Sequence, residues 1–150
     1  MSTPIQSYRP TYLMPKFEKA TVADAMRAGI MSCRPDVPAA EVARIMATHR
    51  IHAVVVEGVE LDAIHGEHLV WGVVSDLDLA RGAFAGLDDL TAAHLAATEP
   101  VTVDTETPLV EAARIMDEHG TAHLIVVQGR RPVGMLSTLD IAGALAWGRH

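Results

Sequence analysis

Apolar positions along the chain follow two spacings, and the order of these spacings is the same in both halves. Between Ala39 and His49, side chains suited to burial recur at i, i+3, i+4 and i+7, and the segment ending at His119 repeats this pattern. Such a spacing predicts a helix with one buried face. Residues 53–56 and 124–127 are unbroken apolar runs, which are typical of strands covered on both faces.

The remaining predicted elements also come in pairs. A short helix is expected after Thr21 and after Thr91, each a suitable N-cap, and a longer helix after Ser75 and after Ser137. Shorter strands are predicted at Ile30–Cys33, Leu69–Val74, Val101–Val103 and Val133–Leu136. Each half therefore has the order α-β-α-β-β-α, which predicts an α/β fold of small sheets covered by helices.

The two halves are copies of one another. Residues 43–46 return at 113–116, an offset of 70 (113 − 43), whereas the motif ending at Asp78 returns at Asp140, an offset of 62 (140 − 78). The first copy therefore carries eight extra residues (70 − 62), which we expect to form a loop at 57–69. Duplicated units usually stack on each other, and clefts between them are common ligand sites.

Composition and charge exclude several classes of protein. The chain of 150 residues is 49% hydrophobic with a mean hydropathy of +0.20, so it is expected to fold as a globular body. It has no apolar run of the roughly 18 residues that a membrane span needs, and residues 1–19 do not form a secretory signal. A net charge of −7 argues against a nucleic-acid surface. The single cysteine, Cys33, favours a reducing cytoplasm.

The repeated motif carries a family resemblance. Both copies have the pattern Gly-hydrophobic-hydrophobic-Ser-x-x-Asp-hydrophobic, preceded by Ala-Arg-Ile-Met and a β-branched run. This arrangement resembles the CBS domain, named after cystathionine β-synthase, and the tandem pair resembles a Bateman module over residues 21–147. The resemblance implies an N-terminal arm at 1–19 and CBS repeats at 20–87 and 88–150, packed as one pseudo-twofold module.

The resemblance also implies a ligand and its binding residues. Family members hold AMP, ADP, ATP, S-adenosylmethionine and sometimes NAD in clefts between the repeats. The motif Asp binds ribose hydroxyls, the Ser holds ribose or phosphate, and apolar groups of the other repeat surround the adenine. Carried over by position, one cleft would use Ser137, Asp140, Met31, Ile51 and His52. The other cleft would use Ser75, Asp78, Val101, Thr121 and Ala122.

A purely structural interpretation of the same motif stays open. Ser-x-x-Asp at a strand-to-helix junction is also a capping box, and a cap alone stabilises a helix by about 1 kcal/mol. The two copies also differ in charge, because Asp76 follows Ser75 whereas Thr138 follows Ser137. A second carboxylate would repel a phosphate. We therefore expect the Ser137 cleft to accept a nucleotide and the Ser75 cleft to be empty or to prefer uncharged or cationic ligands.

These observations together predict a ligand-sensing regulatory module without catalytic activity. No Ser-His-Asp order and no nucleotide-hydrolysing Gly-rich loop is found in the sequence. The output would pass through a homodimer or an unknown protein partner, with the apolar helices at 82–87 and 141–147 as candidate contacts. A structural or protein-interaction module with vestigial clefts is the alternative. The arm itself is expected to pack on the body or across a dimer partner, with its aromatic residues Tyr8, Tyr12 and Phe17 as anchors.

Histidines and the cysteine suggest weaker alternatives. His65 and His68 lie among acidic residues and could hold a metal ion, but a solvated acidic loop is the favoured interpretation, because the segment lacks the fixed spacing of a structural metal site. His52 falls at the expected pocket wall, where it could stack on a purine, and a role as a core or rim histidine stays open. His49 and His119 occupy matched helix ends and indicate a structural role. Cys33 is expected to be a small buried apolar residue. The arginines considered for phosphate contact are Arg34, Arg50 and Arg81.

Overall fold

Each half of the chain has the predicted element order, and the first half has one additional short strand. The structure is a computed structural model that describes residues 15–62, 66–96 and 100–148. The first half contains α1 (Val22–Ala25), β1 (Arg27–Ala28), β2 (Ser32–Cys33), α2 (Ala39–His49), β3 (Ala53–Asp62), β4 (Gly66–Ser75) and α3 (Asp76–Ala85). The second contains α4 (Ala92–Leu95), β5 (Thr102–Asp104), α5 (Leu109–His119), β6 (His123–Gln128), β7 (Arg131–Ser137) and α6 (Thr138–Trp147).

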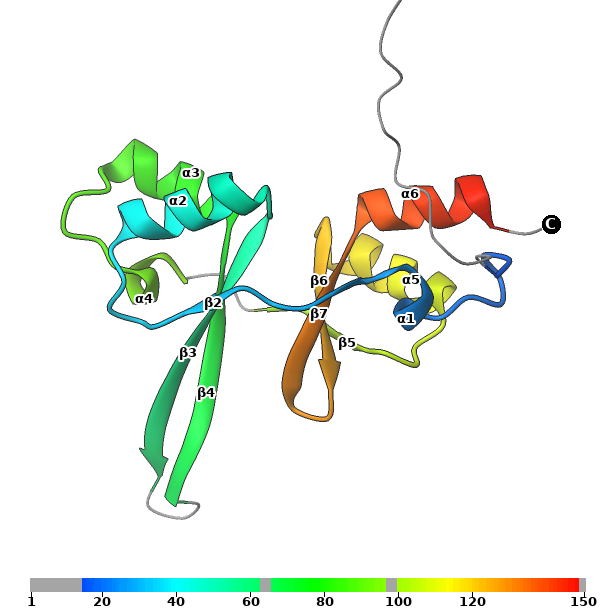
Figure 1. Cartoon of the computed structure of the whole chain (residues 1–150), viewed down its shortest axis with the longest axis horizontal. Helices are drawn as coiled ribbons and strands as arrows, with labels where there is room; N and C mark the ends of the chain where they lie inside the picture. The colour runs from blue at the N-terminus through cyan, green and yellow to red at the C-terminus, as the bar shows by residue number, and fades with distance from the viewer. Residues whose placement is uncertain (1–14, 63–65, 97–99, 149–150) are drawn as a thin grey trace, which may run out of the picture. The chain divides into compact units, whose positions relative to one another are not determined.

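These elements form two compact units, which we call unit 1 and unit 2 (Figure 1). Unit 1 comprises Met1–Gly29 and Val101–His150, and unit 2 comprises Ile30–Pro100. In unit 1 the sheet has the order β1-β7-β6-β5, and in unit 2 it has the order β2-β3-β4. Each sheet contains an antiparallel hairpin, β3–β4 in unit 2 and β6–β7 in unit 1. The first strand of each hairpin also pairs in parallel with a short strand, β2 in unit 2 and β5 in unit 1. The α/β fold is therefore confirmed.

The short first helix of each sequence repeat packs in the unit that is formed mainly by the other repeat. The helix α1 of the first repeat packs in unit 1, where the N–H of Val22 donates to the carbonyl of Thr107 at 2.8 Å. The helix α4 of the second repeat packs in unit 2, where the N–H of Ala92 donates to the carbonyl of Val37, also at 2.8 Å. The compact units therefore cut across the sequence repeats at 20–87 and 88–150.

Each unit has its own hydrophobic core, and the exchanged helix contributes to it. In unit 2, Leu95 of α4 lies among Val42 and Met46 of α2 and Val54 and Val74 of the hairpin. In unit 1, Val22 and Ala25 of α1 join the core residues Leu109, Ala112, Met116, Leu124, Val126 and Leu136. The stripe predicted for residues 39–49 is buried as expected at Val42 and Met46. The exchanged helices are thus integral to the unit that they join.

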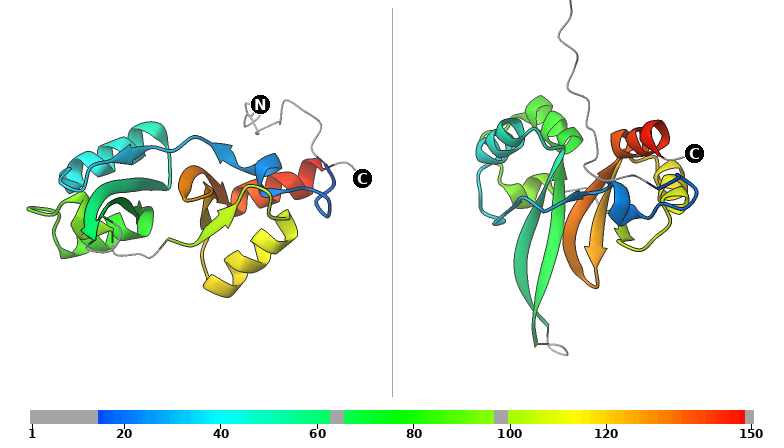
Figure 2. Two further views of the ribbon diagram at one scale, coloured as in Figure 1. Left: turned by 90° about the horizontal axis from the view of Figure 1, so that it is seen from below. Right: turned by 45° about the vertical axis from the view of Figure 1, so that its right-hand side comes forward.

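The segment 57–69 differs from the prediction. It was expected to be a loop, but most of it extends the hairpin of unit 2, whose strands β3 and β4 pair from Ala53 opposite Ser75 to Asp62 opposite Gly66. This long hairpin extends away from the helices of its own unit (Figures 1 and 2). The physical reason is the period-two pattern of residues 59–62, in which Val and Leu alternate with Glu and Asp, as in a strand.

Two shorter predictions also need correction. The strand predicted at Ile30–Cys33 is shorter, at Ser32–Cys33 (β2), and an additional strand that was not predicted, β1 at Arg27–Ala28, precedes it and joins the other sheet. The helix considered as a contact at 82–87 ends at Ala85, because Gly86 takes a φ of 101° and leaves the helical conformation. By contrast, the predicted helix from Ala39 to His49 is confirmed at both ends.

Candidate functional site

The motif serines lie at the last position of a strand and cap the helix that follows. In unit 1, the carboxylate oxygen Oδ2 of Asp140 accepts hydrogen bonds from the N–H of Ser137 at 2.8 Å and from its hydroxyl at 3.1 Å. The N–H of Asp140 in turn donates to the Ser137 Oγ at 3.2 Å. Ser75 and Asp78 make the same three contacts in unit 2 at 2.8, 3.0 and 3.2 Å. Both predicted capping boxes are therefore present.

In unit 1 the other predicted site residues surround this junction through backbone contacts. The N–H of Thr138 donates to the carbonyl of Ala122 at 3.0 Å, which ties the start of α6 to the segment before β6. The Thr121 hydroxyl donates to the carbonyl of His123 at 3.0 Å, and the carbonyl of Val101 accepts from Ile125 at 3.0 Å. Unit 1 thus brings together five predicted residues: Val101, Thr121, Ala122, Ser137 and Asp140.

Unit 2 repeats this arrangement with its own five residues. The N–H of Asp76 donates to the carbonyl of His52 at 2.9 Å, and the carbonyl of Met31 accepts from Val55 at 3.0 Å. Unit 2 therefore groups Met31, Ile51, His52, Ser75 and Asp78 at the equivalent junction. The predicted pairing of the motif of one repeat with the wall residues of the other stays a prediction.

The two aspartates differ in their surroundings. Asp78 is buried, with 3% of its surface exposed, and makes a further interaction beyond its capping box. Asp140 is partly exposed, and its second carboxylate oxygen, Oδ1, accepts no hydrogen bond from the residues that the structure describes. Asp140 therefore keeps a carboxylate oxygen at a partly exposed position that is available to another molecule.

A shallow groove of about 490 Å³ lies beside this junction in unit 1. It is lined by Ala113, Met116 and Asp117 of α5, by Thr138 and Ile141 of α6, and by Gly120, Thr121 and Ala122 between α5 and β6. Two predicted site residues, Thr121 and Ala122, line this groove, whereas Ser137 and Asp140 do not. Its volume falls within the range of small-molecule sites.

Comparison with known proteins identifies the family. The family model of the CBS domain matches residues 22–84 and again residues 92–146. The chain belongs to the CBS domain family. The matches are in tandem, so the protein is a CBS domain pair, or Bateman module, as the repeated motif predicts. Its fold is likewise that of solved CBS domain proteins.

Several proteins resemble this CBS pair. Hypoxic response protein 1 of Mycobacterium tuberculosis strain H37Rv is 30% identical over 125 residues, which cover 81% of this chain and 82% of that protein. A crystal structure of Hypoxic Response Protein I with two coordinated zinc ions is 28% identical, has a TM-score of 0.63 and is covered over 98% of its length by 83% of this chain.

Two further structures share the fold at lower identity. A CBS domain pair in complex with 5′-methylthioadenosine and S-adenosyl-L-methionine is 21% identical, with a TM-score of 0.68 over 83% of this chain and 98% of that one. An uncharacterized conserved protein from Pyrococcus horikoshii is 23% identical, with a TM-score of 0.72 over 89% and 96% of the two chains.

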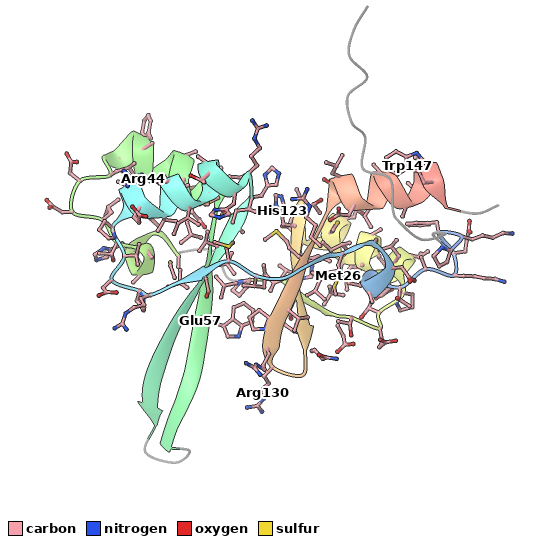
Figure 3. The ribbon with its side chains drawn as sticks, viewed as in Figure 1. Met26, Arg44, Glu57, His123, Arg130 and Trp147 are labelled. Carbon is pink, nitrogen blue, oxygen red and sulfur yellow. The ribbon has the colours of Figure 1, made fainter. Side chains whose placement is uncertain are left out.

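Two arginines of this CBS pair, Arg114 and Arg44, pair with glutamates of their own helices. Arg114 is held by Glu111 and Glu118 on α5, and this contact lowers the pKa of Glu111 and raises that of Arg114. Arg44 pairs with Glu41 at 3.0 Å on α2 (Figure 3). Among the arginines considered for a phosphate, Arg34 pairs with Asp36 at 3.5 Å and is largely exposed. Arg50 and Arg81 are exposed as well.

No metal site is found among residues 15–62, 66–96 and 100–148, where no three His, Cys, Asp or Glu side chains come together. His65 lies outside the described residues, and so do Tyr8 and Tyr12 of the arm. Cys33 packs against the core of unit 2 but is only partly buried, and burial raises the pKa of its thiol. In the same described parts, no helix has the length and hydropathy needed to cross a bilayer.

The matched histidines are structural, as predicted. The ring Nδ1 of His49 bonds to the carbonyl of Ile45 at 2.9 Å, and that of His119 bonds to the carbonyl of Ile115 at 3.0 Å. A carbonyl only accepts hydrogen bonds, so Nδ1 carries the proton in both rings.

The contact that sequence reasoning missed involves another histidine. His52 Nδ1 lies 3.0 Å from Oδ2 of Asp76, 24 residues away. The available signal was the strand register, which places Ala53 opposite Ser75.

Proposed function

We propose that this CBS pair is a non-enzymatic sensor that binds an adenosine-containing compound at the Ser137–Asp140 junction of unit 1. The observation that carries the proposal is the geometry of the Asp140 carboxylate. One of its oxygens completes the capping box, and the other is available at a partly exposed position. A carboxylate oxygen accepts hydroxyl hydrogen bonds, and a ribose presents two adjacent hydroxyls. The cap and the ligand contact are therefore compatible in one residue.

The neighbouring residues support this assignment. Thr121, Ala122 and Thr138 form a groove large enough for a purine beside the same junction. A protein of the same fold binds 5′-methylthioadenosine and S-adenosyl-L-methionine, both of which contain an adenosine ribose. The ligand of this chain is proposed to belong to the same chemical class, which includes AMP, ADP, ATP and S-adenosylmethionine.

Signalling requires that the ligand change an equilibrium of the protein. A ligand shifts a population only if it binds two arrangements with different affinity. We propose that the responding equilibrium is homodimer formation through the last helix of each repeat. Large apolar side chains are exposed there, with 97% of Phe84 on α3 and 75% of Leu139 on α6 open to solvent. Trp147, near the end of α6, is 39% exposed (Figure 3).

The decisive variant is Asp140→Asn, because it separates capping from ligand binding. The amide oxygen of asparagine can replace Oδ2 in the capping box, whereas its NH₂ group replaces the available oxygen with a donor. We expect the variant to melt near the wild-type temperature and to lose stabilisation by AMP, ADP, ATP or S-adenosylmethionine. At a ligand concentration of about 100 Kd the wild type should gain about 2.7 kcal/mol. This corresponds to a rise in Tm of roughly 5–10 °C.

A matched control is available on another helix of unit 1. Asp24 makes the same capping contacts with Thr21, whose N–H donates to Oδ2 at 2.8 Å and whose hydroxyl donates at 3.2 Å. Asp24→Asn should leave the ligand-induced shift unchanged. If no adenosine compound stabilises the wild type, or if Asp140→Asn keeps the full shift, the proposed site is wrong.

The alternative function is a structural or interaction module with vestigial clefts. One observation favours it, namely that both Ser-x-x-Asp motifs are fully explained as capping boxes without a ligand. In that case Asp140→Asn would have only a small effect on stability, and Asp78→Asn a larger one because Asp78 is buried. Dimer formation would then be independent of every compound in the panel.

A further inference from the structure

The first turn of α3 in unit 2 is closed by the side chain of its own first residue. Asp76 Oδ1 accepts the N–H of Leu77 at 2.9 Å, while Oδ2 lies 3.0 Å from Nδ1 of His52. The N–H of Asp76 donates to the carbonyl of His52, and the N–H of Asp78 donates to the Ser75 hydroxyl. Three successive N–H groups at this helix start are therefore used internally.

The equivalent turn of α6 in unit 1 is different at one donor. The N–H of Thr138 donates to the carbonyl of Ala122, and the N–H of Asp140 donates to the Ser137 hydroxyl, as in unit 2. The N–H of Leu139 belongs to the first turn, whose donors have no partner within the helix. No side chain of the described residues accepts a hydrogen bond from it.

The difference follows from two equivalent positions that carry different residues in the two repeats. Thr138 in unit 1 corresponds to Asp76 in unit 2 (138 − 76 = 62), and Ala122 corresponds to His52 (122 − 52 = 70). Unit 1 therefore lacks both the carboxylate that would bind the first-turn N–H and the imidazole that would orient this carboxylate. The capping boxes of the two junctions are alike, with the N–H of the serine 2.8 Å from the aspartate Oδ2 in both, although Asp78 is more deeply buried than Asp140.

We propose that Asp76, oriented by His52, takes the place of a ligand phosphate at the start of α3, so that unit 2 rejects phosphorylated adenosine compounds while unit 1 accepts them. This inference rests on the proposed function and assigns its phosphate selectivity to one residue pair. The available N–H at the start of α6 offers a hydrogen bond and the positive end of a helix dipole to an anion. At the start of α3 the same donor is taken by a carboxylate, which also repels a second anion.

The test compares AMP with adenosine, which differ only in the phosphate. In the full-length protein, Thr138→Asp should weaken AMP binding about tenfold or more, as expected for a like charge at close range. Adenosine affinity should change less than about twofold, because the variant leaves Asp140 and Ser137 in place. Calorimetry measures both affinities, and the AMP effect should shrink at high salt because the side chains are exposed to solvent.

The reciprocal change uses a background in which unit 1 cannot contribute. In Asp140→Asn, the additional substitution Asp76→Thr should raise AMP affinity about tenfold at unit 2 and leave adenosine affinity unchanged. If wild type binds AMP through Asp140 but Thr138→Asp binds it equally well, the selectivity proposal is refuted and the proposed function stands. If wild type binds neither probe, the proposed function fails, and the selectivity proposal fails with it. Thermal unfolding of each variant without ligand verifies that it is folded.

Discussion

Replacing Leu95 by alanine tests the exchange of short helices between the two repeats. Leu95 is 4% exposed and lies in the core of unit 2, although it belongs to the second sequence repeat. The fit around it is tight, because a Cβ placed on Gly82 of α3 would come within 2.8 Å of its Cδ2 atom. Leu→Ala at such sites costs about 3 kcal/mol, including the cavity that remains. Most domains of this size would stay folded after such a loss.

The assay is native-state hydrogen exchange resolved by segment. A local loss of about 3 kcal/mol speeds the opening of the affected unit by roughly a hundredfold. We expect faster exchange in α2, β3 and β4, with little change in α5, β6 and β7. Leu109→Ala is the matched control, because Leu109 also belongs to the second repeat but is fully buried in the core of unit 1. If Leu95→Ala loosened residues 102–137 instead, the assignment of α4 to unit 2 would be refuted.

Three further predictions concern single residues. Arg50 takes a left-handed φ of 51° after α2, where the second repeat has Gly120 at φ 58°, so Arg50→Gly should raise the free energy of unfolding by about 1 kcal/mol; a loss on denaturant titration would contradict this. Burial raises the Cys33 pKa above its ordinary 9.0, so Ellman's reagent should react more slowly with Cys33 than with a free thiol at pH 8. The stability that depends on this raised pKa is complete below pH 9.0 and is lost at higher pH. The variant Cys33→Ala should not show this loss of stability, and if it did, the cysteine would be excluded as the cause. Phe84→Glu should abolish the proposed dimer in light scattering, and an unchanged mass would exclude this helix as the contact.

Much of the fold could be predicted because local pattern and tertiary structure agree. The helix from Ala39 to His49 has a strict helical spacing, and its boundaries are confirmed. The short strand β1 could not be predicted and β2 was predicted too long, because two-residue strands are determined by their partners. Arg27 and Ala28 pair with Met135 and Gly134, whereas Ser32 and Cys33 pair with β3. A Cβ at Gly134 would lie 2.5 Å from the carbonyl oxygen of Arg27, so this close approach also explains the motif glycine of unit 1.

The exchange of α1 and α4 was beyond sequence reasoning for a different reason. The two repeats have the same pattern, so each short helix presents an equally suitable apolar face to either core. The local pattern therefore cannot decide which copy it joins. For the site, the sequence indicated both Ser-x-x-Asp junctions and the charge difference at Asp76 and Thr138. It did not indicate the His52–Asp76 contact or the extra burial of Asp78, both of which depend on strand pairing and packing.

The central claim is that Asp140 binds the ribose of an adenosine compound, and calorimetry with AMP and 2′-deoxy-AMP tests it most directly. A carboxylate that accepts a ribose hydroxyl should favour AMP over the deoxy compound by about tenfold or more in the wild type. In Asp140→Asn this preference should disappear, because neither AMP nor 2′-deoxy-AMP can then donate a hydroxyl hydrogen bond to a carboxylate at position 140. Equal affinities of the wild type for the two compounds, or a preference that survives in Asp140→Asn, would contradict the claim.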